Sequence, residues 1–168
     1  GDEWKVATGG AAKVIGMSMK DRGAILPAGH AADCAFWFYG KDMGQFISST
    51  HYGDSLPRWA RDWNDLGRGQ QLMDLGWDRL YEEAVYAACL PDNNPYEGPF
   101  KGTLKPTFPY DLNALADKNG GMDLLKGTPG GNTLLVDFAL AAIDGEGLGD
   151  DDVTDLLAVS FSATDYVG

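Results

Sequence analysis

A carboxylate follows a short apolar run close to the end of the sequence. Asp165 stands four residues past Phe161, just beyond a segment from Asp155 to Ser162 that is rich in Leu, Val and Phe. This composition predicts a buried β-strand over that segment. Because ligands of open α/β sheets bind beyond the carboxyl ends of the strands, Asp165 is well placed to bind a metal ion or a substrate. The alternative is that Asp165 only caps the next turn, as aspartate after a strand often does.

A pair of cationic side chains follows a second apolar strand pattern. The pattern covers Lys13 to Met19, and Lys20, Asp21 and Arg22 come directly after it. If the backbone stays extended, Lys20 and Arg22 lie on one face and Asp21 on the other, because side chains alternate along a strand. In a chain with a formal net charge of -12, two such cations suit a compact anion such as phosphate. A solvated basic pair balanced by Asp21 is the alternative.

Several longer motifs occur in the order seen in one group of enzymes. They are Lys13–Gly16 continuing to Gly29–His30, Asp92–Gly98, Pro106–Pro109, Thr128–Thr133 and Ser160–Gly168. On these motifs the chain resembles the Thr-nucleophile alkaline phosphatases within the type I phosphodiesterase/nucleotide pyrophosphatase family of the alkaline phosphatase superfamily. Long motifs in register are a far more specific signal than one short pattern. The resemblance implies an α/β fold, namely part of an alkaline-phosphatase-like α/β/α sandwich with a loop-rich insertion.

The resemblance also implies roles for the residues singled out above. Enzymes of this family hold two zinc ions that clamp the oxygens of an in-line phosphoryl transfer to the Thr nucleophile. Asp165 matches one zinc ligand, and a histidine directly after the position of Gly168 would be another. Lys20 and Arg22 match the cations that contact the non-bridging oxygens of the phosphoryl group. A diester carries one negative charge less than a monoester, so this pair favours small-molecule phosphate monoesters.

Most of the family's other catalytic groups would lie before Gly1 or after Gly168. We therefore expect residues 1–168 to be an internal fragment of one catalytic domain, inactive by itself and without bound zinc, because zinc sites need three or four protein donors. The resemblance alone implies a periplasmic or secreted location. A nucleotide pyrophosphatase or phosphodiesterase, and a non-catalytic binding domain of the same fold, are the alternative functions.

Composition adds limits on the class of protein. The length of 168 residues suits one domain or part of one, and no run of residues is long and apolar enough to cross a bilayer. No Lys or Arg follows Lys126, whereas acidic residues are frequent there. Because nucleic-acid backbones attract proteins of the opposite charge, we expect no nucleic-acid binding.

The remaining patterns predict the elements that position these residues. A helix over Asp2 to Thr8 should end at Gly9 and Gly10, since glycine suits a left-handed cap. Apolar and β-branched residues on both sides of the Gly40 to Gly44 turn predict a hairpin of 35–39 with 45–50. Pro57 should open a short helix.

The segment 67–131 shows no clear periodicity and is predicted to be a loop-rich insertion at the active-site mouth. Its aromatic residues are expected to anchor the loop, with a role as the lining of a substrate cleft as the alternative. A helix should follow, capped by Asn132 or Thr133 and ending at Gly145. Capping accounts for Thr133 without a catalytic role.

Other reactive side chains are interpreted as structural. His30 and His51 have no second His or Cys at ligand spacing, so each is expected to be a hydrogen-bonded or surface histidine. Cys34 and Cys89 either pair in an oxidising compartment or are free thiols. The acidic stretch 144–152 does not have the spacing of a calcium loop and is expected to be a solvated loop.

Overall fold

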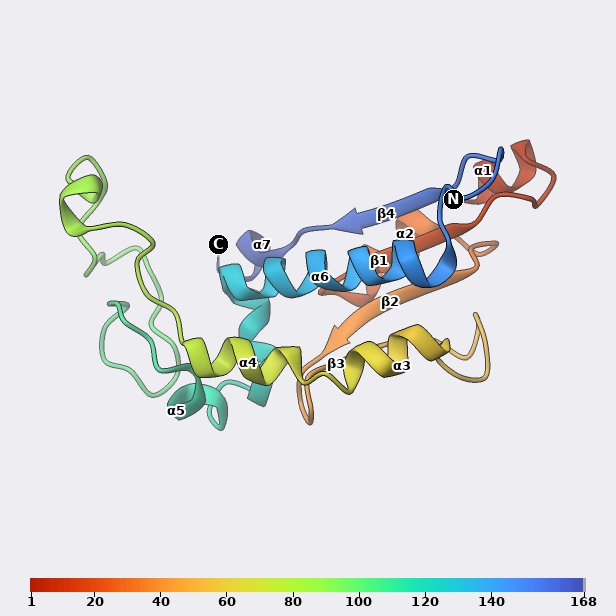
Figure 1. The fold of residues 1–168 in the computed structure, drawn as a ribbon. Helices are drawn as coiled ribbons and strands as arrows, with labels where there is room; N and C mark the ends of the chain where they lie inside the picture. Colours follow the sequence, from red (N-terminus) through yellow and green to blue (C-terminus); the bar gives the residue numbers. More distant parts are fainter. Residues whose placement is uncertain (168) are drawn as a thin grey trace.

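The computed structural model describes residues 1–167, with the backbone alone for Val167. It is a mixed α/β structure with two short 3-10 helices, η1 and η2 (Figure 1). In chain order the elements are α1 (Asp2–Ala7), β1 (Val14–Ser18), α2 (Asp21–Ala28), β2 (Cys34–Tyr39), β3 (Gln45–Ile47), α3 (Arg58–Asn64), α4 (Arg68–Leu75), η1 (Glu83–Tyr86), α5 (Leu112–Ala116), η2 (Gly121–Gly127), α6 (Pro129–Glu146), β4 (Leu156–Ser160) and α7 (Ala163–Val167).

One sheet with the strand order β3-β2-β1-β4 organises these elements. The strand β1 pairs in parallel with both β2 and β4, and β2 pairs with β3 in antiparallel fashion. All five residues of β1 are buried, because the strand has neighbours on both edges and helices on both faces. Such a strand is expected to be apolar throughout rather than alternating, which is why Val14 to Ser18 was recognisable as a strand.

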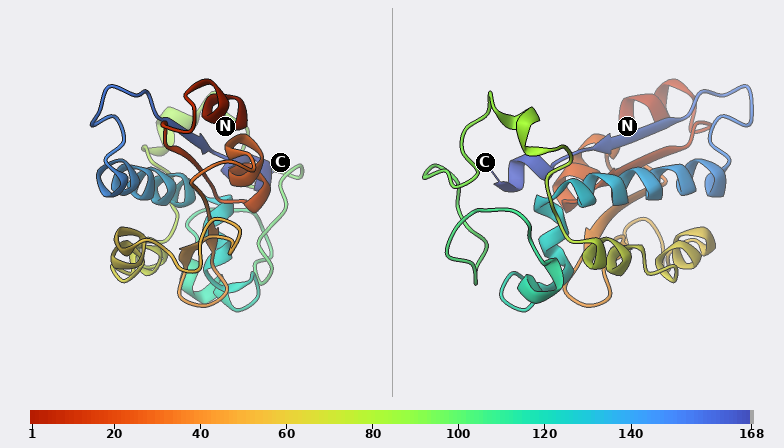
Figure 2. Two further views of the ribbon diagram at one scale, coloured as in Figure 1. Left: turned by 90° about the vertical axis from the view of Figure 1, so that its right-hand side faces the viewer. Right: turned by 60° about the vertical axis from the view of Figure 1, so that its left-hand side comes forward.

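Helices cover both faces of this sheet, as an α/β/α sandwich requires. On one face α2 packs so closely that a side chain at Gly16 would meet Ala24 O at 2.1 Å. On the other face Met17 and Phe36 join the main core with Phe138 of α6. The end-on view in Figure 2 shows the strands between α2 on one side and α6 with α3 on the other. The predicted fold class is therefore confirmed for the described residues.

Several predicted elements agree with the structure. The two strands near the chain ends lie where the apolar runs predicted them, each slightly shorter than predicted. The hairpin of β2 and β3 is confirmed, and its second strand ends at Ile47. Helix α1 is followed by Gly9 and Gly10, both with positive φ angles. Pro57 is the N-cap residue of α3.

The predicted start of the long helix was wrong. Helix α6 begins at Pro129, with Thr128 in an extended N-cap conformation, and it ends at Glu146 with Gly147 rather than Gly145 as the capping glycine. The glycines at 130 and 131 have low helix propensity and suggested a later start. The structure requires Gly131, because a β-carbon there would lie 2.4 Å from Leu125 O. Thr133 consequently lies inside the helix and not at its cap.

The segment 67–131 contains more regular structure than its lack of periodicity indicated. It includes α4, α5, η1 and η2, and Leu112, Leu124 and Leu125 are buried in the main core. Short helices of five to eight residues give too few turns for a periodic pattern to be recognised. The extent of an insertion over these residues stays a prediction.

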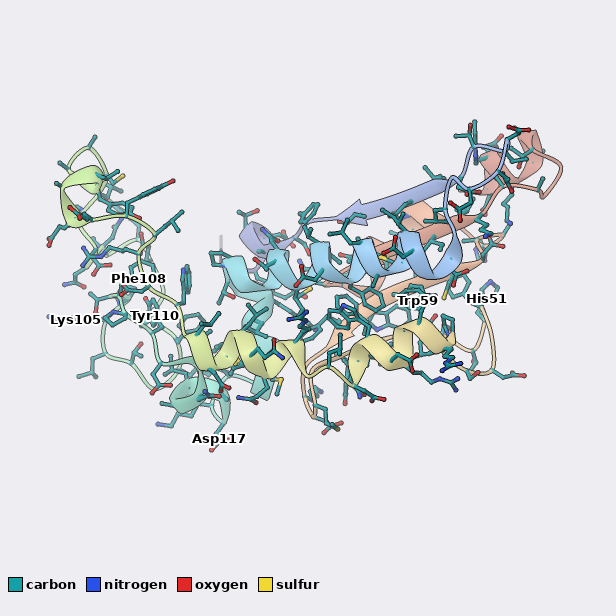
Figure 3. The ribbon with its side chains drawn as sticks, viewed as in Figure 1. His51, Trp59, Lys105, Phe108, Tyr110 and Asp117 are labelled. Atoms are coloured by element: carbon teal, nitrogen blue, oxygen red, sulfur yellow. The ribbon has the colours of Figure 1, made fainter. Side chains whose placement is uncertain are left out.

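Aromatic side chains hold the longest irregular part of this segment. The ring centroid of Trp77 lies 5.1 Å from that of Phe108 and 5.5 Å from that of Tyr110, and Phe100 lies 5.1 Å from Tyr110. Figure 3 labels Phe108 and Tyr110 at the end of the molecule opposite to Trp59 and His51. The predicted anchoring role is confirmed for these four rings.

We predict that Gly16→Ala destabilises the fold by about 1–3 kcal/mol, because α2 has to move away from β1 to admit the methyl group. Urea denaturation of the two proteins measures this difference. Gly98→Ala is the control, since a β-carbon at Gly98 would meet no atom within 4 Å. Equal stability of Gly16→Ala and the unchanged chain would show that the α2 contact is not tight.

Candidate functional site

The carboxyl ends of β1 and β4 lie at the same edge of the sheet. These strands pair in parallel with Ser18 opposite Ser160, so the residues that follow each strand emerge side by side. The prediction that both strands deliver their next residues to one edge is confirmed, although 142 residues separate Ser18 from Ser160. In Figure 1 this edge lies at the end of the sheet where α7 and the start of α6 are found.

Lys20 and Asp165 form an ion pair at this edge. The Lys20 Nζ atom contacts Asp165 Oδ2, and the side chains are 26% and 68% exposed. The same Nζ lies 4.3 Å from the ring centre of Tyr166, within the range of a cation–π contact. The ammonium group is therefore held between a carboxylate and an aromatic ring. Sequence reasoning gave Tyr166 no role, although its position beside Asp165 was a usable signal.

The expected extended backbone from Lys20 to Arg22 was wrong. Lys20 is extended, with φ -116° and ψ 140°, but it is the N-cap residue of α2, and the chain is helical from Asp21 onward. The Asp21 carboxylate accepts a hydrogen bond of 2.7 Å from the Arg22 amide. An acidic residue in the first turn stabilises a helix, which favours this turn over an extended strand. Arg22 is exposed, on the first turn of α2.

The first turn of α6 also borders this edge. A β-carbon at Gly131 would lie 3.1 Å from Met19 Cε, so this turn packs against the end of β1. Nearby elements leave two buried side-chain oxygens, Asn132 Oδ1 and Ser162 Oγ, without a hydrogen-bond partner among residues 1–167. The pKa of Tyr166 is raised, mainly by burial and further by the carboxylates of Asp123 and Asp21.

The described residues do not form a zinc site by themselves. Across residues 1–167 no group of three or more His, Cys, Asp or Glu side chains is arranged to hold a metal ion. Zinc sites in proteins take three or four protein ligands, and this edge offers Asp165, which is paired with Lys20. Gly168, the last residue of the motif that contains Asp165, lies outside the described residues.

The other candidate side chains lie elsewhere. His51 Nε2 lies 3.0 Å from His30 O, and both histidines are exposed. Figure 3 shows His51 far from Phe108 and Tyr110, at the end of the sheet opposite to α7. These positions agree with the predicted surface role of the two imidazoles.

Both cysteines are free thiols in this structure. Cys34 is half-buried, and its Sγ lies 3.2 Å from Ser48 Oγ. Burial raises the pKa of Cys34 to about 11, which leaves the thiol protonated and unreactive at neutral pH. Cys89 is exposed.

The acidic stretch divides between a helix and a loop. Asp144 and Glu146 belong to the last turn of α6, whereas Asp150 to Asp152 are exposed in the loop that follows. Asp155 closes this loop by accepting hydrogen bonds from the amides of Gly149 and Lys13.

We predict that Lys20→Gln loosens α7, because it removes the ammonium group that contacts Asp165 and Tyr166. Contacts of this exposure are worth up to about 1 kcal/mol, so amide exchange in residues 161–167 should become roughly fivefold faster. Hydrogen exchange followed by NMR measures the effect. Arg22→Gln is the matched control and should leave these rates unchanged. A comparable acceleration in both variants would show that the contacts of Lys20 with Asp165 and Tyr166 do not hold α7 in place.

The chain is similar over nearly its whole length to three longer proteins. It is 48% identical over 169 residues to a calcium-transporting ATPase of Myroides odoratus, 45% identical over 168 residues to alkaline phosphatase PhoV of Synechococcus elongatus, and 43% identical over 167 residues to alkaline phosphatase PafA of Elizabethkingia meningoseptica. Each alignment covers 99% of this chain and 30% of the relative. No protein-family model matches the sequence.

Solved structures agree with these relatives. The crystal structure of wild-type alkaline phosphatase PafA superimposes with a TM-score of 0.92 at 43% identity, over 99% of this chain and 32% of that one. A PafA variant with four substitutions gives a TM-score of 0.88 at 40% identity. The resemblance found in the motifs is thereby confirmed: over nearly its whole length the chain is similar to the PafA and PhoV alkaline phosphatases, and it spans about 30% of their length.

Proposed function

We propose that residues 1–168 are part of the catalytic domain of a zinc-dependent phosphate monoester hydrolase. In this proposal the phosphoryl group passes in line to a Thr nucleophile outside these residues, and the 168-residue chain alone is inactive. The observation that carries the proposal is the meeting of Lys20 and Asp165 at the carboxyl-terminal edge of two parallel strands. Open α/β sheets bind their ligands at this edge.

Lys20 and Arg22 would bind the phosphoryl oxygens. The Lys20 ammonium is half-buried and already pairs with a carboxylate, so its surroundings accommodate an anionic oxygen. Arg22 lies two residues further along, in the first turn of α2, from where its planar guanidinium can reach the same edge. Two substituted residues of the PafA variant, a lysine and an arginine, have the same spacing as this pair. Both cations would stabilise the charge of the transferring group.

Asp165 would be a metal ligand in the whole protein. Its carboxylate is the single described acidic group in contact with Lys20, and further ligands would have to come from outside residues 1–167. Zinc, when bound, would act as a Lewis acid on the phosphoryl oxygens. Because the described residues do not complete such a site, this part of the proposal depends on the resemblance to the family.

The substrate class follows from charge. A phosphate monoester dianion has one more negative charge than a diester, so a site with two cations stabilises it more strongly. In a chain with a net charge of -12, Lys20 and Arg22 are the cations that the proposal assigns to the phosphoryl oxygens. A periplasmic or secreted location is part of the same proposal. None of the helices among residues 1–167 has the length and hydropathy needed to cross a membrane.

In the full-length protein we predict that Lys20→Ala or Arg22→Ala lowers kcat/KM for a phosphate monoester by about 100-fold, by analogy with the loss of one oxyanion donor. The loss for a matched diester should be clearly smaller, because less charge has to be stabilised. Steady-state assays with a nitrophenyl monoester and diester measure both. Arg58→Ala is the control, since Arg58 is 87% exposed and pairs with Asp62 on α3. Equal losses on the two substrates would mean that the pair does not select the monoester.

The purified 168-residue chain should show no turnover of a chromogenic phosphate monoester, with or without added zinc. Isothermal titration should also detect weak zinc binding or none, because no three ligand side chains among residues 1–167 are arranged to hold a metal ion. Robust hydrolysis by this chain would contradict the proposal that nucleophile and metal ligands lie outside it.

A further inference from the structure

One buried hydroxyl group lies at the carboxyl-terminal edge of the sheet. Ser18 is the last residue of β1, and none of its surface is exposed. Its neighbours along the chain include Ile15, Met17 and Met19, which are buried apolar residues. A buried polar group is costly unless it forms hydrogen bonds, so the partners of this hydroxyl indicate why a serine stands in an otherwise apolar strand.

The Ser18 hydroxyl joins the two segments that carry the candidate site. Its oxygen accepts a hydrogen bond of 3.2 Å from the Lys20 amide and donates one of 3.1 Å to Ser160 O, at the end of β4. The first bond holds the backbone of Lys20, and the second holds the strand that leads to Asp165. One hydroxyl group therefore connects the backbone at Lys20 with the strand end that precedes Asp165.

The start of α2 lacks the usual capping side chain. Lys20 is the N-cap residue, and its side chain makes no capping hydrogen bond, because an ammonium group cannot accept one. Most helices instead place Ser, Thr, Asp or Asn at this position, whose oxygen bonds an amide of the first turn. Ser18 supplies an oxygen from two residues earlier, to the amide of the N-cap residue itself.

The packing around this hydroxyl leaves little room for another arrangement. A β-carbon at Gly23, in the first turn of α2, would lie 2.5 Å from Ser18 Oγ and 3.3 Å from Ser160 Oγ. The hydroxyl of Ser18 is thus enclosed by β1, β4 and α2. The turn from strand to helix at Lys20 is therefore held by all three elements.

We propose that Ser18 is a positioning residue for Lys20. Its hydroxyl holds the backbone from which the Lys20 ammonium reaches a phosphoryl oxygen, next to the strand that precedes Asp165. This inference rests on the proposed function, in which Lys20 contacts the phosphoryl group. Ser18 acts through Lys20 and not on the substrate, because it is fully buried. Such a role affects the rate, since misplacing a catalytic group by about 1 Å can cost about 100-fold.

Ser18→Ala in the full-length protein tests this role, because it removes the oxygen and adds no atom. We expect kcat/KM for a nitrophenyl phosphate monoester to fall by about 10-fold. In a Lys20→Ala background the same substitution should change kcat/KM by less than about twofold, because the effects of residues that act as a unit are not additive. An equal loss with and without the Lys20 side chain would overturn the proposal.

Ser48→Ala is the matched control. The Ser48 hydroxyl also links two segments, since it donates to Ala35 O and lies 3.2 Å from Cys34 Sγ. These partners are at the start of β2, at the amino-terminal edge of the parallel strands. Ser48→Ala should therefore leave kcat/KM unchanged, although it removes a comparable hydrogen-bonding group. Equal losses of kcat/KM in Ser18→Ala and Ser48→Ala would show a general effect on stability and would refute the positioning role.

Hydrogen exchange of the full-length protein, followed by mass spectrometry, measures the backbone directly. Peptides that cover residues 18–24 should exchange faster in Ser18→Ala than in the unchanged protein or in Ser48→Ala, because the start of α2 opens more readily. Unchanged exchange would overturn the proposal.

The kinetic results also separate this inference from the proposed function. If Lys20→Ala leaves kcat/KM unchanged, the proposed function fails and the role of Ser18 fails with it. If Lys20→Ala is impaired and Ser18→Ala keeps full activity, the positioning role alone fails.

Discussion

The parallel pairing of β1 with β4 is the constraint on which the rest of this structure depends. It joins the two ends of the described chain, and two carboxylates hold the start of β1 in register. Asp155 accepts a 2.7 Å hydrogen bond from the Lys13 amide, and Asp33 accepts one of 2.7 Å from the Val14 amide. The hydrogen bonds from Gly149 and Lys13 lower the pKa of Asp155, which therefore stays ionised at neutral pH. These two hydrogen bonds lie at the amino-terminal edge of the sheet, so they do not occupy the carboxyl-terminal edge where Lys20 and Asp165 lie.

Two glycines determine where α2, and with it Lys20, lies relative to the sheet. Gly16 lets α2 approach the sheet, and Gly23 lets its first turn sit over the strand ends, where a β-carbon would lie 2.5 Å from Ser18 Oγ. The turn from strand to helix therefore occurs at Lys20 and directs that side chain along the edge toward α7. A larger residue at either glycine would displace the helix that carries both cations. The two glycines thus contribute to the site by allowing a short distance between α2 and β1, although they do not contact Lys20 or Asp165.

The ion pair of Lys20 and Asp165 at the carboxyl-terminal edge differs from the hydrogen bonds of Asp155 and Asp33 at the amino-terminal edge. Asp155 and Asp33 bond to backbone amides and serve the register of the sheet, whereas Lys20 and Asp165 bond to each other and are partly exposed. An exposed ion pair contributes little to stability, and the proposed function assigns its position at the end of two parallel strands to ligand binding. The same charges that would contact a phosphate ester and a metal ion neutralise each other in the chain as described.

The sequence by itself predicted the strands, the resemblance to alkaline phosphatases and, for two parallel strands of one sheet, the edge at which Lys20 and Asp165 lie. Apolar runs such as Leu156 to Ser160 can be recognised locally, and parallel strands of one sheet present their carboxyl ends together. Only the tertiary structure decided that the chain turns into a helix at Asp21, that α6 starts at Pro129, and that α4 and α5 belong to the core. Those choices depend on close packing between separate elements, such as Gly131 of α6 against Leu125 of η2 and Gly16 of β1 against Ala24 of α2. Local propensity disfavours glycine in a helix, and only the close approach of another element reveals why glycine is needed there.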